Sequence, residues 1–221
     1  MTLQELIARF RVLAHDKAAR PFWSSEDIAR WLSDGQTQAC IRGRLLREDA
    51  RDAICRIALV PGQHTYKLHR TVYEIIDVRI KPIVGPSRKL KPVTREWLDA
   101  EMPDWRDCNR PAQFAIQDEN SLRLVGTIEE GDVLHLECYR LPLAALEDES
   151  DEPEIHAAHH EHLIEWALFK AYSVPDADAF DPTRAKMAED AFTRYFGLQP
   201  DSDMRRATRQ DVQHYVRAIL P

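Results

Sequence analysis

The residues of this chain whose types and spacing could support chemistry are four histidines within a stretch of seven residues: His156, His159, His160 and His162. If the stretch is helical, His156 and His160 are four residues apart on one face, a spacing that can bind Zn²⁺, and Glu165 would be the third ligand. The motif H-E-x-x-H is absent, because isoleucine occupies position 164. We therefore interpret the histidines as surface or interface residues of a helix, and a small metal-dependent enzyme that uses His156 and His160 is the alternative.

No other motif in the sequence is typical of an active site. The chain has seven glycines and contains neither a G-x-S-x-G nucleophile motif nor a glycine-rich phosphate loop. Residues 147–154 are rich in carboxylates, and such a run is usually a solvated linker. A strip that pairs with a basic partner and a cation-binding loop are the alternatives. The sequence therefore predicts a protein that is not an enzyme, with no catalytic residue, no cofactor and no bound metal.

Composition narrows the class of protein. The chain has 30 Lys and Arg against 37 Asp and Glu, a net charge of −7, whereas a general nucleic-acid binder usually carries a clustered basic excess. No apolar run approaches the roughly 20 residues that a membrane-spanning helix needs, and no leader is recognised, so we expect a cytosolic protein without membrane contact. The four cysteines form no C-x-x-C pair and are predicted to be reduced structural thiols.

Residues 1–51 have the apolar spacing of two helices. The first helix begins with the capping-box pair Thr2 and Glu5, and the second begins after Ser24 with acidic residues in its first turn, where the helix dipole favours them. Gly35 lies inside the second helix, where glycine costs about 1 kcal/mol relative to alanine, so a kink or a close packing contact is expected there.

Residues 52–146 alternate between apolar and polar side chains, as half-buried antiparallel strands do. A strand is predicted over 52–60, with 65–68 as its hairpin partner, and a longer strand is predicted over 73–81. A short capped helix at 94–98 and three further strands complete this β-rich module.

Residues 147–197 contain the acidic hinge and two more helices, predicted at about 155–172 and 182–196. The sequence thus predicts an α+β fold. In this fold, helices from residues 1–51 and 147–197 form one helical bundle, the antiparallel β-rich module of residues 52–146 is inserted in it, and a C-terminal arm of residues 198–221 follows.

The arm is the part of the chain for which a partner-binding role is predicted. It turns mildly basic after an acidic body and retains several apolar residues. We expect it to dock on a partner or on a neighbouring subunit, where binding would offset the entropy cost of ordering it. A frayed terminus and a nucleic-acid-binding module are the alternatives. The predicted contact residues are Arg205, Arg206, Arg209, Tyr215, Val216, Ile219 and Leu220.

Several packing and turn motifs, in order along the chain, resemble those of the head–tail adaptor (neck or connector) proteins of short-tailed bacteriophages. The motifs are Phe22-Trp23-Ser24-x-x-Asp27, Arg95-Glu96-Trp97-Leu98-Asp99, Pro103-Asp104-Trp105, Tyr139-Arg140-x-Pro142 and Glu154-Ile155-His156.

This resemblance implies a structural protein of the virion that self-associates into a ring beneath the portal protein. The ring would be a dodecamer, would join the capsid to a tail or nozzle protein, and would line the channel through which genomic DNA passes without sequence-specific binding. The resemblance places the protein in the neck of the virion, and in the host cytoplasm during assembly.

Overall fold

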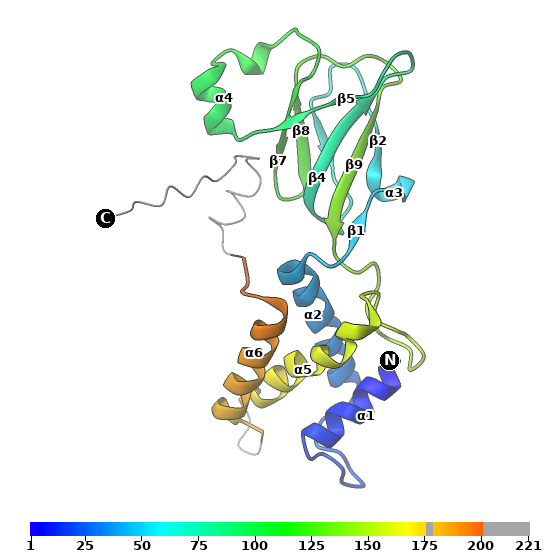
Figure 1. Cartoon of the computed structure of the whole chain (residues 1–221), viewed down its shortest axis with the longest axis vertical. Helices are drawn as coiled ribbons and strands as arrows, with labels where there is room; N and C mark the ends of the chain where they lie inside the picture. Colours follow the sequence, from blue (N-terminus) through cyan, green and yellow to red (C-terminus); the bar gives the residue numbers. More distant parts are fainter. Residues whose placement is uncertain (176–178, 201–221) are drawn as a thin grey trace, which may run out of the picture. The chain divides into compact units, whose positions relative to one another are not determined.

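The computed structural model describes residues 1–175 and 179–200. Within them the chain forms two compact units (Figure 1). The helical unit consists of residues 1–46 and 140–199, and the β unit consists of residues 47–139. Most of the helical residues lie in one unit and the two sheets lie in the other, so the predicted α+β class is confirmed. None of the helices in the described part of the chain is long and apolar enough to span a bilayer.

The helices of the helical unit begin at side chains that cap their free backbone N–H groups. Thr2 and Glu5 form the predicted capping box, Ser24 accepts a hydrogen bond from the Asp27 amide, and Asp181 accepts from the amides of residues 183 and 184. The unit contains α1 (Leu3–Leu13), α2 (Ser25–Gly43), the 3-10 helix η2 (Ala157–His162), α5 (Leu163–Tyr172) and α6 (Pro182–Phe196).

Helices from the two ends of the sequence share one hydrophobic core (Figure 1). At Gly35 of α2, an added Cβ would lie 3.1 Å from the Cβ of Trp166 on α5. Glycine therefore allows the two helices to approach closely, which is the packing contact that the sequence indicated. The indole N–H of Trp166 also donates to Asp34, at 2.8 Å. Fully buried members of this core are Leu6, Phe10, Ile28, Leu32, Leu163, Ile164 and Phe192.

The β unit contains two sheets. The first has the order β1 (Arg47–Glu48), β9 (Val133–Arg140), β4 (Val72–Lys81), β5 (Arg88–Lys89), and β2 (Arg56–Ala58) also pairs with β9. The second has the order β3 (Thr65–Lys67), β8 (Ser121–Val125), β7 (Phe114–Gln117), β6 (Lys91–Pro92). The β6–β7 pair is parallel, whereas β7 and β8 are antiparallel.

Two predictions for the start of the β unit are wrong. Residues 52–55 do not begin a strand but form the short helix α3 (Asp52–Cys55), which buries the adjacent residues Ile54 and Cys55 together. A strand would have turned these two side chains to opposite faces. The predicted hairpin is also absent, because β2 pairs with β9 and β3 pairs with β8 in the other sheet. The Tyr66 hydroxyl lies within hydrogen-bonding distance of Val60 and Gln63, which fixes the chain between the two strands.

A small helical layer covers part of the second sheet. Helix α4 (Arg95–Glu101) begins at Thr94, which accepts from the Trp97 amide as the sequence predicted, and the 3-10 helix η1 (Trp105–Asp107) follows. The indole N–H of Trp105 donates to Asp99, at 2.8 Å. These helices pack on β7 and β8 through a cluster of Val93, Leu98, Trp105, Ile116 and Val125.

Candidate functional site

The histidine pair that could have bound a metal is divided between two different environments. His156 precedes η2, and its Nδ1 accepts from the Ala158 amide at 3.2 Å. His160 is buried, with Nδ1 2.9 Å from the Met1 amino nitrogen and Nε2 2.9 Å from the Ile155 carbonyl oxygen. The predicted α-helix over this stretch is wrong for 157–162, where the 3-10 helix has about three residues per turn. The four-residue spacing therefore does not align His156 with His160.

The other two histidines connect η2 to α6 through Tyr195. His159 Nδ1 lies 3.1 Å from the Tyr195 hydroxyl oxygen, and the His162 ring stacks on the Tyr195 ring with centroids 3.5 Å apart. Among the described residues, no three His, Cys, Asp or Glu side chains gather in a way that could hold a metal ion. In the helical unit these histidines thus act as packing residues.

Acid should weaken this contact between η2 and α6. The pKa of His159 is lowered from its usual 6.5, first by burial and then by the neighbouring His156, His162 and His160. The unfolded chain therefore binds more protons than the folded chain as the pH falls below about 6.5, and stability decreases in that direction.

We expect the free energy of unfolding to fall between pH 7.5 and pH 5.5, and His159→Gln to reduce that slope. Urea unfolding of the full chain at three pH values would measure it. The comparison with the parent is needed because His135 in the β unit also has a pKa lowered by burial, Arg56 and Lys81. An unchanged slope in His159→Gln would contradict the assignment.

The acidic segment is solvent-exposed, as the sequence predicted, and forms an ordered loop of the helical unit. Asp151 accepts hydrogen bonds from the backbone amides of Glu147 and Asp148, both at 2.9 Å, and these bonds lower its pKa. The backbone carbonyls of Asp151 and Glu149 accept from the amides of residues 3 and 4, at 2.7 and 3.1 Å. These are N–H groups at the start of α1 that have no partner within the helix. The loop therefore caps α1.

A groove lies between α1, α2 and this acidic loop, all within the helical unit. Its volume is about 850 Å³. The apolar part of its lining comes from Leu3, Ile7, Ala8, Ala29 and Leu146. Glu147 and Glu149, both exposed, lie on its acidic side. A groove with an apolar floor and a charged rim is a suitable surface for a protein partner.

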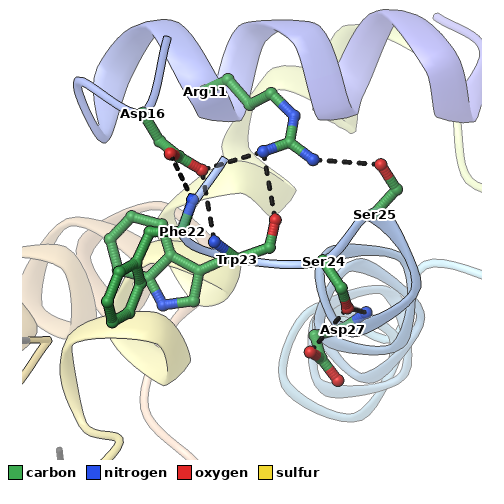
Figure 2. A network of polar contacts seen from close by, with 7 residues as sticks. All are labelled: Arg11, Asp16, Phe22, Trp23, Ser24, Ser25 and Asp27. Atoms are coloured by element: carbon green, nitrogen blue, oxygen red, sulfur yellow. Dashed lines mark hydrogen bonds and ion pairs between the residues drawn. The ribbon is translucent and has the colours of Figure 1, made fainter. Parts of the chain in front are cut away.

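A polar network fixes the two helices that form the groove (Figure 2). The guanidinium of Arg11 donates to Asp16 at 2.8 Å, to the Trp23 carbonyl at 3.1 Å and to the Ser25 hydroxyl at 3.0 Å. The buried Asp16 carboxylate also accepts from the Phe22 amide, at 2.7 Å. These bonds join the end of α1 to the start of α2 and so fix the two helical walls of the groove relative to each other.

The β unit has a different exposed surface, the hairpin of β4 and β5. Residues 79–91, which we name the basic hairpin, contain five basic residues and no acidic residue in a chain of net charge −7. At its tip, Ile83 and Val84 are 74% and 87% exposed. The tip is held against the turn at 129–132, where Ile83 lies over Gly131 and Arg88 pairs with the buried Asp132 at 3.6 Å.

The predicted contact residues of the arm, from Arg205 to Leu220, lie outside the described residues. The structure instead reveals the groove and the basic hairpin, neither of which the sequence reasoning identified. A signal for the hairpin was present, because 79–91 has no acidic residue to balance its five basic ones. The groove had no comparable signal, since three separate segments form it.

Residues 1–214 match the family model described as SU10 adaptor protein. None of the curated proteins matches the chain.

Proposed function

The chain belongs to the SU10 adaptor protein family, and from this membership we propose that it is a head-to-tail adaptor that forms a ring below the portal protein of a bacteriophage. The membership confirms the resemblance to phage adaptor proteins that the sequence motifs indicated. A phage adaptor is a structural component of the virion. We propose further that the ring is a dodecamer, that it joins the capsid to a tail or nozzle protein, and that it assembles in the host cytoplasm.

The observation that carries the ring proposal is the presence of two dissimilar exposed surfaces on one chain. The groove lies in the helical unit and the basic hairpin lies in the β unit. A subunit in a closed ring contacts its two neighbours through different surfaces, because head-to-tail contacts are heterologous. Two such surfaces fit a subunit of a closed ring better than a monomeric enzyme.

The acidic character of the chain supports a role in lining the DNA channel. With a net charge of −7, the protein as a whole repels phosphate. Genomic DNA would therefore slide through the ring without sequence-specific binding and without adhering to its wall.

We propose that residues 198–221 form the docking arm toward the portal or a neighbouring subunit. The apolar residues Tyr215, Val216, Ile219 and Leu220 would supply buried contact area, at about 1.5–3 kcal/mol for each fully buried side chain. The arginines Arg205, Arg206 and Arg209 would face carboxylates of the partner.

Mixing the full chain with purified portal protein and imaging the complex by electron microscopy tests the proposal. We expect a ring of twelve copies on one end of the portal. The variant Tyr215→Asp with Ile219→Asp should lose most of this binding, whereas the control Gln213→Asp should retain it. A protein that never associates with any portal would contradict the proposed function, and equal binding by both variants would contradict the arm.

A further inference from the structure

We propose that the basic hairpin of one subunit inserts its apolar tip into the groove of a second copy of this chain. This inference rests on the self-association part of the proposed function and names the two surfaces that meet. The contact joins the β unit of one subunit to the helical unit of its neighbour.

The groove needs an occupant that is apolar at its centre and basic at its edge. Ile7 is partly buried and Ala8 is exposed, so apolar surface is accessible on its α1 wall. On its acidic side, neither the Glu147 carboxylate nor the Glu149 carboxylate takes part in a hydrogen bond or ion pair with another described residue. Arg11 and Arg30, which also line the groove, are paired with Asp16 and Glu26. The unbalanced charge at the groove is therefore negative.

The basic hairpin has the complementary features. Ile83 and Val84 are adjacent at its tip and are the most exposed pair of large apolar side chains in the β unit as described. Lys81 is exposed and has no ion-pair partner among the described residues. Arg88 and Lys89 lie on the opposing strand, because Ile80 pairs with Arg88 and Arg79 pairs with Lys89. Arg79 and Lys89 pair with Asp77, and Arg88 pairs with Asp132. Lys81 is therefore the cation beside the apolar tip whose charge is not balanced by a described carboxylate.

The charges on the two surfaces suggest a second copy as the occupant. Glu147 and Glu149 at the groove, and Lys81 beside the hairpin tip, have no ion-pair partner among the described residues. Opposite charges across an interface steer the encounter and fix its register. Because the groove and the hairpin are different surfaces, the contact is heterologous, and its repetition generates a ring when the rotation closes.

Cysteine cross-linking tests the contact directly. Ala8 and Val84 are both exposed, so Ala8→Cys and Val84→Cys should leave the fold intact. Three native thiols are buried and Cys108 is half-buried. With a short bismaleimide reagent, an equal mixture of the two single variants should give a covalent dimer, and a chain carrying both cysteines should give a ladder of oligomers. The control mixture, Val60→Cys with Ala8→Cys, places its cysteine at another exposed valine of the β unit and should give no dimer.

The outcomes separate this inference from the proposed function. A ring on the portal without the cross-link between residues 8 and 84 would overturn the inference and leave the adaptor function intact. The cross-link without portal binding would support the inference alone. If the chain with both cysteines is linked only within itself and the mixed single variants give no dimer, the contact between copies is wrong.

Charge reversal provides a second test. Lys81→Glu should reduce the dimer yield about tenfold, and Glu147→Lys with Glu149→Lys should reduce it by a similar factor. Mixing a subunit that carries Lys81→Glu with one that carries Glu147→Lys and Glu149→Lys should restore most of the dimer yield. Lys67→Glu, which reverses an exposed lysine of the β unit outside the hairpin, is the matched control and should have little effect. If this mixture gives as little dimer as either variant alone, charge pairing between these surfaces is excluded.

Discussion

Replacing Phe192 by alanine is expected to lower the free energy of unfolding of the helical unit by about 3–5 kcal/mol. The Phe192 side chain has no exposed surface. Its ring centroid lies 5.0 Å from that of Trp166 and 4.7 Å from that of Phe196, and the guanidinium carbon of Arg42 lies 5.1 Å from it. Truncation would remove these contacts and leave a cavity where α6 packs against α5 and α2.

The matched control is Met187→Ala on the same helix. Met187 is 68% exposed, so its truncation should change the stability by no more than about 0.5 kcal/mol. Urea unfolding of the full chain, followed by circular dichroism at 222 nm, would measure both, because the free energy of unfolding falls linearly with urea concentration. Similar losses in the two variants would mean that α6 is not part of the core.

Gly126→Ala is expected to destabilise the β unit by about 2–6 kcal/mol, from backbone strain of about 1–3 kcal/mol and overpacking of about 1–3 kcal/mol. Gly126 has φ +114°, a conformation that residues with a side chain rarely adopt. An added Cβ would lie 2.5 Å from the Arg110 carbonyl oxygen and 2.7 Å from the Ala112 Cα. The Thr127 amide donates to that same carbonyl at 2.7 Å, so the backbone cannot move aside without losing this bond.

The substitution Gly62→Ala separates the cost of backbone strain from the cost of steric overlap. Gly62 has φ +81°, but no atom lies within 4 Å of its added Cβ. Its substitution should therefore cost about 1–2 kcal/mol, from the backbone conformation alone. Hydrogen exchange of the β7 and β8 amides would measure the loss of stability of the β unit in both variants. Equal effects at the two glycines would show that the close approach at Gly126 is not limiting.

The sequence was sufficient to predict an element where interactions between neighbouring residues determine its structure. Helix starts at Thr2, Ser24 and Thr94 were readable because each side chain caps backbone amides within its own turn. Strand β9 was readable because its buried residues alternate with half-buried ones, as a sheet with one buried face requires. The resemblance to phage adaptor proteins, now confirmed by the family match, came from such packing and turn motifs in their order.

The sequence was insufficient to predict local structure where contacts with distant segments determine it. Residues 52–55 alternate like a strand, but they form a helical turn that buries Ile54 and Cys55 side by side. Residues 157–162 have helical spacing, but they form a 3-10 helix in which His160 binds the backbone of Ile155 and the Met1 amino group. Tertiary contacts of this kind override local propensity.

The two candidate surfaces also differ in whether the sequence alone could show them. The basic hairpin is one continuous segment, so its charge and its apolar tip are both visible in the sequence. The groove combines α1, α2 and the loop at 145–149, and only the folded helical unit brings them together. The predicted arm residues lie outside the described part of the chain and stay a prediction.

The division of the helical unit into residues 1–46 and 140–199 has a consequence for how the protein is made. A ribosome synthesises α1 and α2 first, but their apolar faces are covered by α5 and α6, which emerge more than a hundred residues later. The β unit is contiguous and can fold while the nascent chain is still being extended. We therefore expect the first two helices to be targets for chaperones during translation, until α6 emerges and completes their core.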